Sequence, residues 1–520
     1  MSDLDQVLEE LPALAEELRA QHGIPGLAVG VCDASDVLWA GGLGTTDGPS
    51  DRSVDLDTRF SVQSTSKLVT ATGVLLGVRD GLVDLDAPIL DHLPDFTVGS
   101  VFESRPERLM TLRHLLTHTA GFTHEAPLGG NYDVRPHAFA EHVASIRDTW
   151  LRFPVGHHHE YSNLGIDLAG HLLAQAAGTS FAHFLRTRMF DPLGMTRSTF
   201  DFDDVEDDPN AARGHSKAFA EAGADLPRRV PMIPAGGLYT SLGDVLRLLQ
   251  LHLSDGAPLL DPTLYAEHTA FPRLSPEQDE GYGLCLYVDH WAPGVEVRHH
   301  GGAGYGFLCQ VFWLPELGLG GAVLTSSVDH NVQNDLAEAL CLRLARASGV
   351  TQAPPPSEVP ADASPLPPSA AGRYLGRLGD LVELRDEEVP GHRLLPDQHD
   401  RTRYLLERRT GEVRYKLHVD GVPASTLPVA LLGEYRSHVD GVPIGRYRLR
   451  QSASGAVLEQ PRAGSWDDPL SLQLESLGDG RFLSATGEIL DTTGGAVTYA
   501  NIPLTRSSET SDVVAGDTTS

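Results

Sequence analysis

The chain has 520 residues, a formal net charge of −31 and 41% hydrophobic residues. This length exceeds one ordinary domain, and the apolar fraction is enough for several hydrophobic cores. The strong negative charge argues against nucleic acid or an anionic membrane as a partner. The four cysteines are scattered without a C-x-x-C pair, so they indicate neither a disulfide framework nor a zinc site. No apolar run reaches membrane-spanning length and the acidic amino terminus leads into a helical pattern, so we expect a cytoplasmic protein.

The first part of the chain predicts a helix, two strands and a second helix. Apolar residues at helical spacing predict a core-facing helix over residues 4–20. Two apolar runs, residues 26–32 and 37–41, are joined by a polar turn and predict paired strands. The second helix opens at Ser64 and ends at Asp80-Gly81, because glycine commonly terminates helices.

The region from residue 111 to residue 347 predicts helices, then strands, then a final helix. The predicted helices cover residues 112–121, 166–177, 181–189, 242–253 and 334–347, and the predicted strands cover residues 283–288, 295–298, 310–314 and 318–325. Strands therefore lie on both sides of a helical region. With the strands predicted over residues 26–41, this order predicts an α+β domain whose sheet unites the chain's two termini.

A proline-rich stretch, residues 351–371, is the clearest domain boundary in the sequence. It separates a first domain, residues 1–350, from a second domain, residues 372–506. In the second domain, short alternating runs with turn residues predict an all-β, barrel-like fold of lipocalin type. Residues 507–520 are polar and are predicted to be disordered.

The stretch Ser64-Thr65-Ser66-Lys67 places a hydroxyl and an amine three residues apart. Residues at i and i+3 share a helix face, so Ser64 and Lys67 are expected to touch. A serine hydroxyl becomes an effective nucleophile when a neighbouring base takes its proton. Lysine can be that base where its pKa is lowered, whereas arginine keeps its proton. The chain has only three lysines, Lys67, Lys217 and Lys416, and otherwise uses arginine, which favours a removable proton at Lys67 over a lysine on a solvated helix face.

Two further motifs follow in order, Tyr161-Ser162-Asn163 and His300-Gly301-Gly302. Together with Ser64 and Lys67 they resemble the penicillin-recognising serine hydrolases: class C β-lactamases, D,D-peptidases, D-aminopeptidases and related esterases. That family has S-x-x-K, then Y-x-N, then K-T-G or H-x-G on a strand. The resemblance covers about residues 5–345. It implies a β-lactamase/transpeptidase-like catalytic domain, with an antiparallel sheet flanked by helices and a helical subdomain.

The resemblance also implies roles for the first two motifs. Ser64 matches the acylated nucleophile and Lys67 its partner base, while Tyr161 matches the tyrosine that shares the proton transfer. Asn163 matches the amide that holds the substrate. The sequence leaves open whether Lys67 or Tyr161 takes the serine proton; tyrosine would need a pKa well below its usual value near 10.

The third motif is expected to bind substrate through His300, Gly301, Gly302 and Ala303. The resemblance implies an oxyanion hole made by the backbone amides of Ser64 and of Ala303. A second register is also possible, in which His299 is the matching histidine and Gly302 supplies the amide.

His300 stands where class C β-lactamases have lysine, and histidine is mostly neutral near pH 7. This departure weakens the case for carboxylate-bearing β-lactams and is closest in pattern to the D-aminopeptidase branch. That branch has a β-barrel extension whose loop reaches the active site. Two related Asp-Gly segments, His418–Pro423 and His438–Pro443, each predict a hairpin turn and are candidates for such a loop.

The favoured function is hydrolysis of small amides or short peptides, including D-amino-acid ones, through an acyl-enzyme. The alternatives are an esterase, an acyltransferase or a β-lactamase on the same groups, or a catalytically silent binding protein.

The run His157-His158-His159-Glu160 suggests metal binding, but adjacent residues point in different directions and no distant ligands accompany them. We therefore expect no metal and no cofactor. A small-molecule or short-peptide substrate and a homodimer are the expected partners.

Overall fold

The chain forms two compact units, one made mainly of residues 1–364 and the other mainly of residues 365–520. The predicted linker, residues 351–371, lies outside the described residues, as does nearly all of the predicted tail, so the predicted boundaries stay predictions. The computed structural model describes residues 3–46, 52–100, 103–130, 137–149, 151, 154–156, 159–221, 225–271, 281–292, 294–350, 372–376, 381–384, 392–396, 404–408, 416–418, 426–439, 442–452, 455–462, 465–478, 480–484, 489–494, 496–499 and 502–507.

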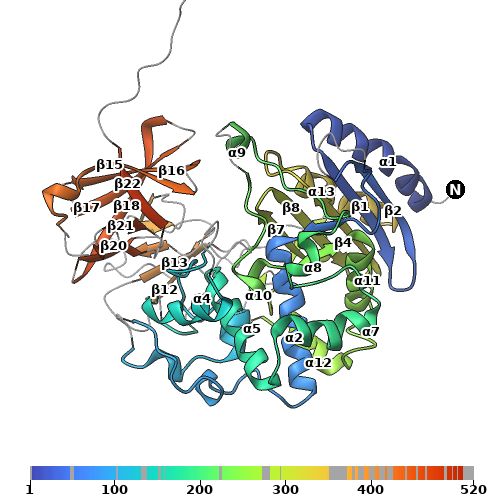
Figure 1. Cartoon of the computed structure of the whole chain (residues 1–520), viewed down its shortest axis with the longest axis horizontal. Coiled ribbons are helices and arrows are strands. Elements are labelled where there is room, and N and C mark those ends of the chain that lie inside the picture. The colour runs from blue at the N-terminus through green and yellow to red at the C-terminus, as the bar shows by residue number, and fades with distance from the viewer. Residues whose placement is uncertain are drawn as a thin grey trace, which may run out of the picture. The chain divides into compact units, whose positions relative to one another are not determined.

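Among these residues, a seven-stranded antiparallel sheet forms the frame of the first unit (Figure 1). Strand β1 lies beside β9 although the two are far apart in the sequence, with Ala28 opposite Leu324. This pairing confirms the prediction that one sheet unites the early strands with the late strands on the other side of the helices. The spatial order is β2 (Val37–Gly44), β1 (Gly26–Asp33), β9 (Leu319–Thr325), β8 (Phe307–Leu314), β7 (Val295–Gly304), β6 (Tyr287–Ala292) and β5 (Gly281–Tyr282).

Each face of this sheet is covered by helices. Alternate strand residues point to opposite faces, so Val29 joins a core with α1 (Asp3–His22) and α13 (Val332–Ala347). Its neighbour Ala28 joins a larger core with α11 (Leu242–Leu253) and the helical region. Strands β3 (Arg59–Ser61) and β4 (Tyr239–Ser241) form a short antiparallel pair, and Phe60 of β3 packs in this larger core.

The helical region supplies most of the residues of interest. It contains a 3₁₀ turn, η1 (Gln63–Thr65), followed by α2 (Ser66–Arg79) and α5 (Asn163–Ala177), which ends at Gly178 in the left-handed conformation. The remaining helices are α3 (Leu112–Leu116), α4 (Phe139–Ser145), α6 (Phe181–Leu185), a π-helical turn (Arg186–Phe190), α7 (Asp191–Leu193), α8 (Asp203–Glu206), α9 (Lys217–Glu221), α10 (Ile233–Gly236) and α12 (Pro262–Thr269). Shorter 3₁₀ turns cover Ile89–Asp91, Pro106–Arg108 and Ile146–Asp148.

Several predicted boundaries are wrong. The α-helix begins at Ser66, and Ser64 lies in the 3₁₀ turn before it. The helix predicted over residues 112–121 ends at Leu116, because His118 adopts a positive φ of 56°. Of the strand predicted over residues 283–288, residues 283–286 connect β5 to β6 and only residues 287–288 belong to a strand, β6. The strand predicted over residues 295–298 continues to Gly304.

The second unit is all-β, as predicted. Its strands β15 to β22 pair with their sequence neighbours and close into a barrel through β15 and β22, which is the up-and-down arrangement of lipocalin-like barrels. They are β15 (Gly433–Val439), β16 (Val442–Ser452), β17 (Gly455–Arg462), β18 (Ser465–Gly478), β19 (Arg481–Ser484), β20 (Ile489–Gly494), β21 (Ala496–Tyr499) and β22 (Ile502–Arg506).

The region predicted as the barrel domain, residues 372–506, contains a second sheet besides the barrel. Its first strands form a separate sheet, in the order β11 (Leu381–Leu384), β10 (Gly372–Gly376), β14 (Lys416–His418), β13 (Tyr404–Arg408) and β12 (His392–Pro396). Both predicted Asp-Gly turns lie outside the described residues; on either side of the second one, Val439 of β15 pairs with Val442 of β16.

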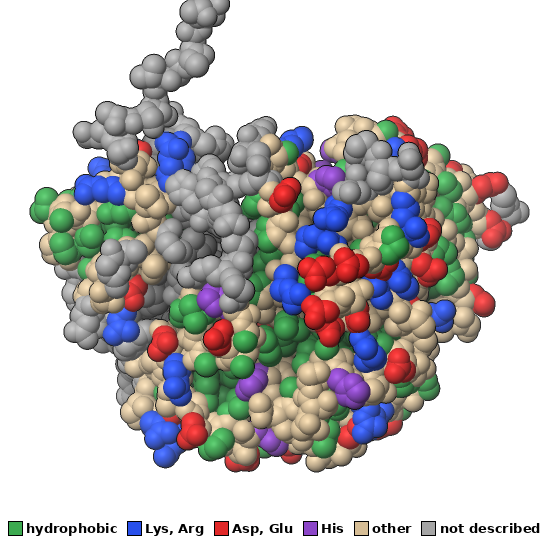
Figure 2. All heavy atoms as spheres, viewed as in Figure 1, with side chains coloured by type: hydrophobic (Ala, Val, Ile, Leu, Met, Phe, Trp, Pro, Cys, Tyr) green, Lys and Arg blue, Asp and Glu red, His purple; other side chains and the backbone are tan. Residues whose placement is uncertain are grey.

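Acidic and basic side chains are interspersed on the face in Figure 2, where red and blue groups adjoin over the first unit. Within the described residues, no helix is both long and apolar enough to cross a bilayer.

Candidate active site

Ser64 lies on a tight turn between a strand and a helix. Ser61 of β3 pairs with Tyr239, and the Val62 amide donates to the Leu238 carbonyl at 3.1 Å, so the strand is held up to the turn. Gln63 then adopts a positive φ of 49°, a conformation that disfavours residues with a Cβ, and its side-chain amide donates to the Ser61 hydroxyl at 2.7 Å. Ser64 is half-buried while its neighbours are buried.

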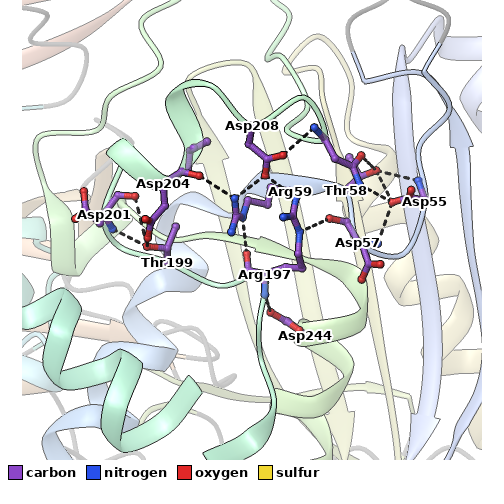
Figure 3. A network of polar contacts seen from close by, with 12 residues as sticks. Asp55, Asp57, Thr58, Arg59, Arg197, Thr199, Asp201, Asp204, Asp208 and Asp244 are labelled. Atoms are coloured by element: carbon purple, nitrogen blue, oxygen red, sulfur yellow. Dashed lines mark hydrogen bonds and ion pairs between the residues drawn. The ribbon is translucent and has the colours of Figure 1, made fainter. Parts of the chain in front are cut away.

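An ion network around Arg59 anchors β3 (Figure 3). The Arg59 guanidinium donates to the Asp208 carboxylate at 2.5 Å and to the Arg197 carbonyl at 2.9 Å. Arg197 also donates to Asp208 at 2.5 Å. Because these groups are largely buried, the network ties the strand before Ser64 to the segment around residues 197–208.

The Lys67 amine is completely buried and contacts three oxygens. It donates to the Ser64 hydroxyl at 3.0 Å, to Asn163 Oδ1 at 2.7 Å and to the Ala235 carbonyl at 2.7 Å. Burial lowers the pKa of Lys67 to about 8, although the carboxylates of Asp167 and Glu125 act in the opposite direction. The amine can therefore lose its proton near neutral pH, which is the property that S-x-x-K chemistry requires.

Tyr161 and Asn163 approach the same amine from the start of α5. The Lys67 ammonium lies 4.8 Å from the centre of the Tyr161 ring, and the Tyr161 hydroxyl is hydrogen-bonded to Ser64. Burial raises the pKa of Tyr161 well above its usual value, so the phenol keeps its proton. The Asn163 amide donates to Glu125 Oε1 at 2.8 Å, which directs its oxygen to Lys67.

Strand β7 passes directly beside the Ser64 turn. A Cβ on Gly302 would lie 2.0 Å from the Val62 carbonyl oxygen and 3.0 Å from the Ser64 amide nitrogen, so only glycine permits this approach. The β6–β7 pairing ends at Tyr287 and His299, so in the described part of the chain the outer edge of β7 has no strand partner beyond His299. Ala303 is exposed on this edge.

The two histidines of β7 face different environments. The His300 ring centre lies 6.4 Å from that of Tyr161, whereas the His299 ring packs 4.4 Å from Trp291 on the other side of the strand. The structure thus places His300, and not His299, beside the candidate nucleophile. His300 Nδ1 donates to the Gly301 carbonyl at 2.7 Å and Nε2 accepts from the Tyr282 hydroxyl at 3.0 Å. Burial lowers the pKa of His300 to about 3, so the ring is neutral.

The structure brings all the predicted site residues to one place. Lys67 contacts Ser64, Asn163 and the Tyr161 ring, and Gly302 of β7 lies against the Ser64 turn. Their functional roles stay predictions. His157 and His158 lie outside the described residues, and the part of the chain that is described holds no group of three or more His, Cys, Asp or Glu side chains suited to a metal ion.

Sequence reasoning missed several groups at the site. The Ala235 carbonyl carries no sequence signal, because any residue has one. The His118 ring packs between two tyrosines, with its centre 4.5 Å from that of Tyr161 and 4.9 Å from that of Tyr282. The phrase Thr117-His118-Thr119 adjoins a helix end, and a positive φ at His118 is the feature that turns its ring inward.

Comparison with known proteins decides the family. The model of the family described as Beta-lactamase matches residues 6–346. The chain belongs to the beta-lactamase family. This assignment confirms the expected family of serine hydrolases and the expected fold of the first domain.

Individual relatives are distant. Penicillin-binding protein 4 of Amycolatopsis lactamdurans is 29% identical over 387 residues, covering 69% of this chain and 95% of the relative. Esterase EstB of Burkholderia gladioli is 25% identical over 376 residues, covering 65% of this chain and 95% of the relative. The structure of D-amino acid amidase from Ochrobactrum anthropi SV3 with D-phenylalanine aligns with a TM-score of 0.55 at 23% identity, covering 66% of this chain and 99% of the amidase, and shows a shared fold. For two further curated relatives the chain spans 65% and 59% of their length.

Proposed function

We propose that the protein hydrolyses small amides or short peptides through an acyl-enzyme on Ser64. One observation carries the proposal: the fully buried Lys67 amine lies 3.0 Å from the Ser64 hydroxyl, and its pKa is lowered to about 8 by burial. A base with such a pKa is neutral in part of the molecules near pH 7, so it can accept a proton at working pH.

Acylation follows from these contacts. Neutral Lys67 takes the Ser64 proton as the Ser64 oxygen bonds to the substrate carbonyl carbon. When the bond to the leaving amine breaks, that amine takes a proton from Lys67, relayed through the Tyr161 hydroxyl that is hydrogen-bonded to Ser64. Water then attacks the acyl carbon and gives a proton to neutral Lys67. When the bond between the acyl carbon and the Ser64 oxygen breaks, Lys67 returns that proton to the Ser64 oxygen, and the acid leaves. Because the pKa of Tyr161 is raised, Lys67 is the base in this scheme and Tyr161 the relay.

The outer edge of β7 supports a mode of substrate binding. An oxyanion formed at Ser64 would accept from the backbone amides of Ser64 and Ala303, as an oxyanion hole requires. The unpaired edge beyond His299 offers backbone donors and acceptors to an extended acyl group. Asn163 would hold the substrate amide from the opposite side.

The neutral His300 side chain favours substrates that have no carboxylate next to it. Both imidazole nitrogens are engaged within the protein and the ring is neutral, so His300 offers neither a cation nor a free donor. We propose that the side chain shapes the pocket while the backbone of Gly301, Gly302 and Ala303 contacts substrate. Amino-acid amides, including D-configured ones, fit this neutral side chain, and the amidase from O. anthropi shares the fold.

An esterase is the second candidate. The similarity to esterase EstB extends over 95% of that relative. An ester would acylate Ser64 more easily than an amide, because an alkoxide leaves more readily than an amide nitrogen. An acyltransferase or a β-lactamase would use the same groups. A catalytically silent binding protein would have no use for a lysine whose pKa is lowered beside a serine.

Labelling and a substrate panel test these proposals. The protein and its Ser64→Ala variant would be incubated with a fluorophosphonate probe, then with D- and L-amino-acid amides, p-nitrophenyl esters and nitrocefin. We expect an adduct on Ser64 that the variant lacks, and turnover of amides. Turnover of esters alone would favour the esterase, and a protein that forms no adduct on Ser64 would be the silent one.

A further inference from the structure

A completely buried acid–base pair lies behind Lys67, away from Ser64. His142 of α4 and Asp167 of α5 are both fully buried, and His142 Nε2 lies 2.9 Å from Asp167 Oδ2. Burial disfavours charge on either side chain, and neither contacts the Ser64 hydroxyl. The acylation scheme above does not use them.

The contacts of His142 fix where its protons are. Its Nδ1 lies 2.7 Å from the Leu128 carbonyl oxygen, which can only accept, so Nδ1 carries a hydrogen. The contact between Nε2 and Asp167 therefore needs one bridging proton. Burial acts against the charged ring and also raises the pKa of Asp167. The hydrogen bond that His142 Nε2 donates to Asp167 nevertheless raises the pKa of His142, which favours an imidazolium facing a carboxylate.

One backbone residue connects this pair to Lys67. The second Asp167 oxygen, Oδ1, accepts from the Ala235 amide at 2.9 Å, and the Ala235 carbonyl accepts from the Lys67 amine at 2.7 Å. Helix α10, which carries Ala235, packs closely on α5. A Cβ on Gly170 would lie 2.4 Å from Pro234 Cγ, so glycine at this position permits the approach.

We propose that Asp167 and His142 are positioning residues for the Ser64–Lys67 pair. Asp167 holds the Ala235 peptide so that its carbonyl faces the Lys67 amine, and its carboxylate, paired with His142, sets how readily that amine loses its proton. The role in catalysis rests on the proposed acyl-enzyme function. The coupling to the Lys67 amine does not, since it follows from the contacts alone.

Other titratable groups also face this centre. Glu125, in the loop after α3, acts on both Lys67 and His142, and Cys285 also acts on Lys67. The Lys67 amine lies 4.8 Å from the centre of the Tyr161 ring. His118 and His300 are kept neutral by burial, which lowers the pKa of each. Among these groups, Asp167 is the one that accepts a hydrogen bond from the Ala235 amide, and the carbonyl of Ala235 accepts from the Lys67 amine.

The test is Asp167→Asn, which keeps the size of the side chain and an oxygen for the Ala235 amide but removes the charge. With only three lysines in the chain, ¹³C-lysine labelling and NMR can follow the Lys67 titration directly, with Lys217→Arg and Lys416→Arg used for assignment. We expect the Lys67 midpoint to fall by about one pH unit, as expected for loss of a nearby buried carboxylate. The rate of Ser64 labelling by the fluorophosphonate should rise at correspondingly lower pH.

Two further variants keep the proposal falsifiable. His142→Gln leaves the carboxylate without its counter-charge and should move the Lys67 midpoint upward, or downward if Asp167 then takes a proton. Asp244→Asn removes another buried carboxylate, one bound to Arg197 and Ser198, and should leave the midpoint unchanged. An unchanged Lys67 midpoint in both Asp167→Asn and His142→Gln would overturn the proposal. If the unmodified protein labels no serine, the proposed function fails, while the NMR titration still decides the coupling.

Discussion

At Lys67 the protein holds a cation in a completely buried position beside a hydroxyl. Burial alone would make such a group costly, and its three oxygen contacts offset part of that cost. An arginine could make similar contacts but could not lose its proton. A lysine at this position can therefore accept a proton, whereas an arginine could serve only as a structural cation.

The Lys67→Arg variant tests this distinction. We expect acylation of Ser64 to slow by at least about 10²-fold, since the variant keeps the charge and loses the base. Stopped-flow measurement of the p-nitrophenol burst would give the acylation rate, and thermal unfolding would establish that the variant folds. A burst of unchanged rate would exclude Lys67 as the base.

At the scale of elements, the close approach of β7 to the Ser64 turn determines the geometry of the site. Gly302 lies against Val62 and the Ser64 amide with no room for a side chain. A strand displaced from this turn would move the Ala303 amide away from the proposed oxyanion position. Gly302 is therefore required at this position because it has no Cβ.

The Gly302→Ala variant should lose most of its activity, because a Cβ 2.0 Å from the Val62 oxygen forces the two elements apart. The matched control is Gly320→Ala in β9 of the same sheet, where the nearest atom to the new Cβ would lie at 3.4 Å. The measurement is kcat/KM for both variants with the best substrate of the panel. Equal activity in the two variants would contradict the role given to this approach.

The sequence predicted the contact between Ser64 and Lys67 although it misplaced the helix start. A 3₁₀ turn also brings residues i and i+3 to one side, so the spacing was informative for either conformation. The Asp167–His142 pair could not be predicted, because its members are far apart in sequence and belong to no local pattern. The strand end at Gly304 was missed for a related reason, since glycines weaken the strand signal while serving a close packing contact.

At the scale of the whole molecule, buried neutral histidines link stability to pH. Burial lowers the pKa of His268 to about 4 and that of His300 to about 3, and it lowers the pKa of His252 well below its usual value. In the unfolded chain each would titrate near 6.5. Below that pH the unfolded state binds protons that the native state does not, so stability falls as the pH decreases.

We expect the free energy of unfolding of the first unit to decline between pH 6.5 and about 4.5. Each such histidine contributes a slope of about 1.4 kcal/mol per pH unit. His268→Gln should reduce the slope by about one such contribution, whereas His183→Gln, at an exposed position, should leave it unchanged. Urea unfolding across this pH range is the measurement, and a slope unaffected by His268→Gln would contradict the assignment.

The rate of Ser64 labelling as a function of pH tests the central claim most directly. Peptide mapping after brief exposure to a fluorophosphonate would identify the modified residue, and repeating it from pH 6 to pH 9.5 would give the rate profile. The account predicts a single adduct on Ser64 whose rate increases with pH with a midpoint near 8, the pKa of Lys67. An adduct on another residue, or a rate on Ser64 that is constant across this range, would contradict it.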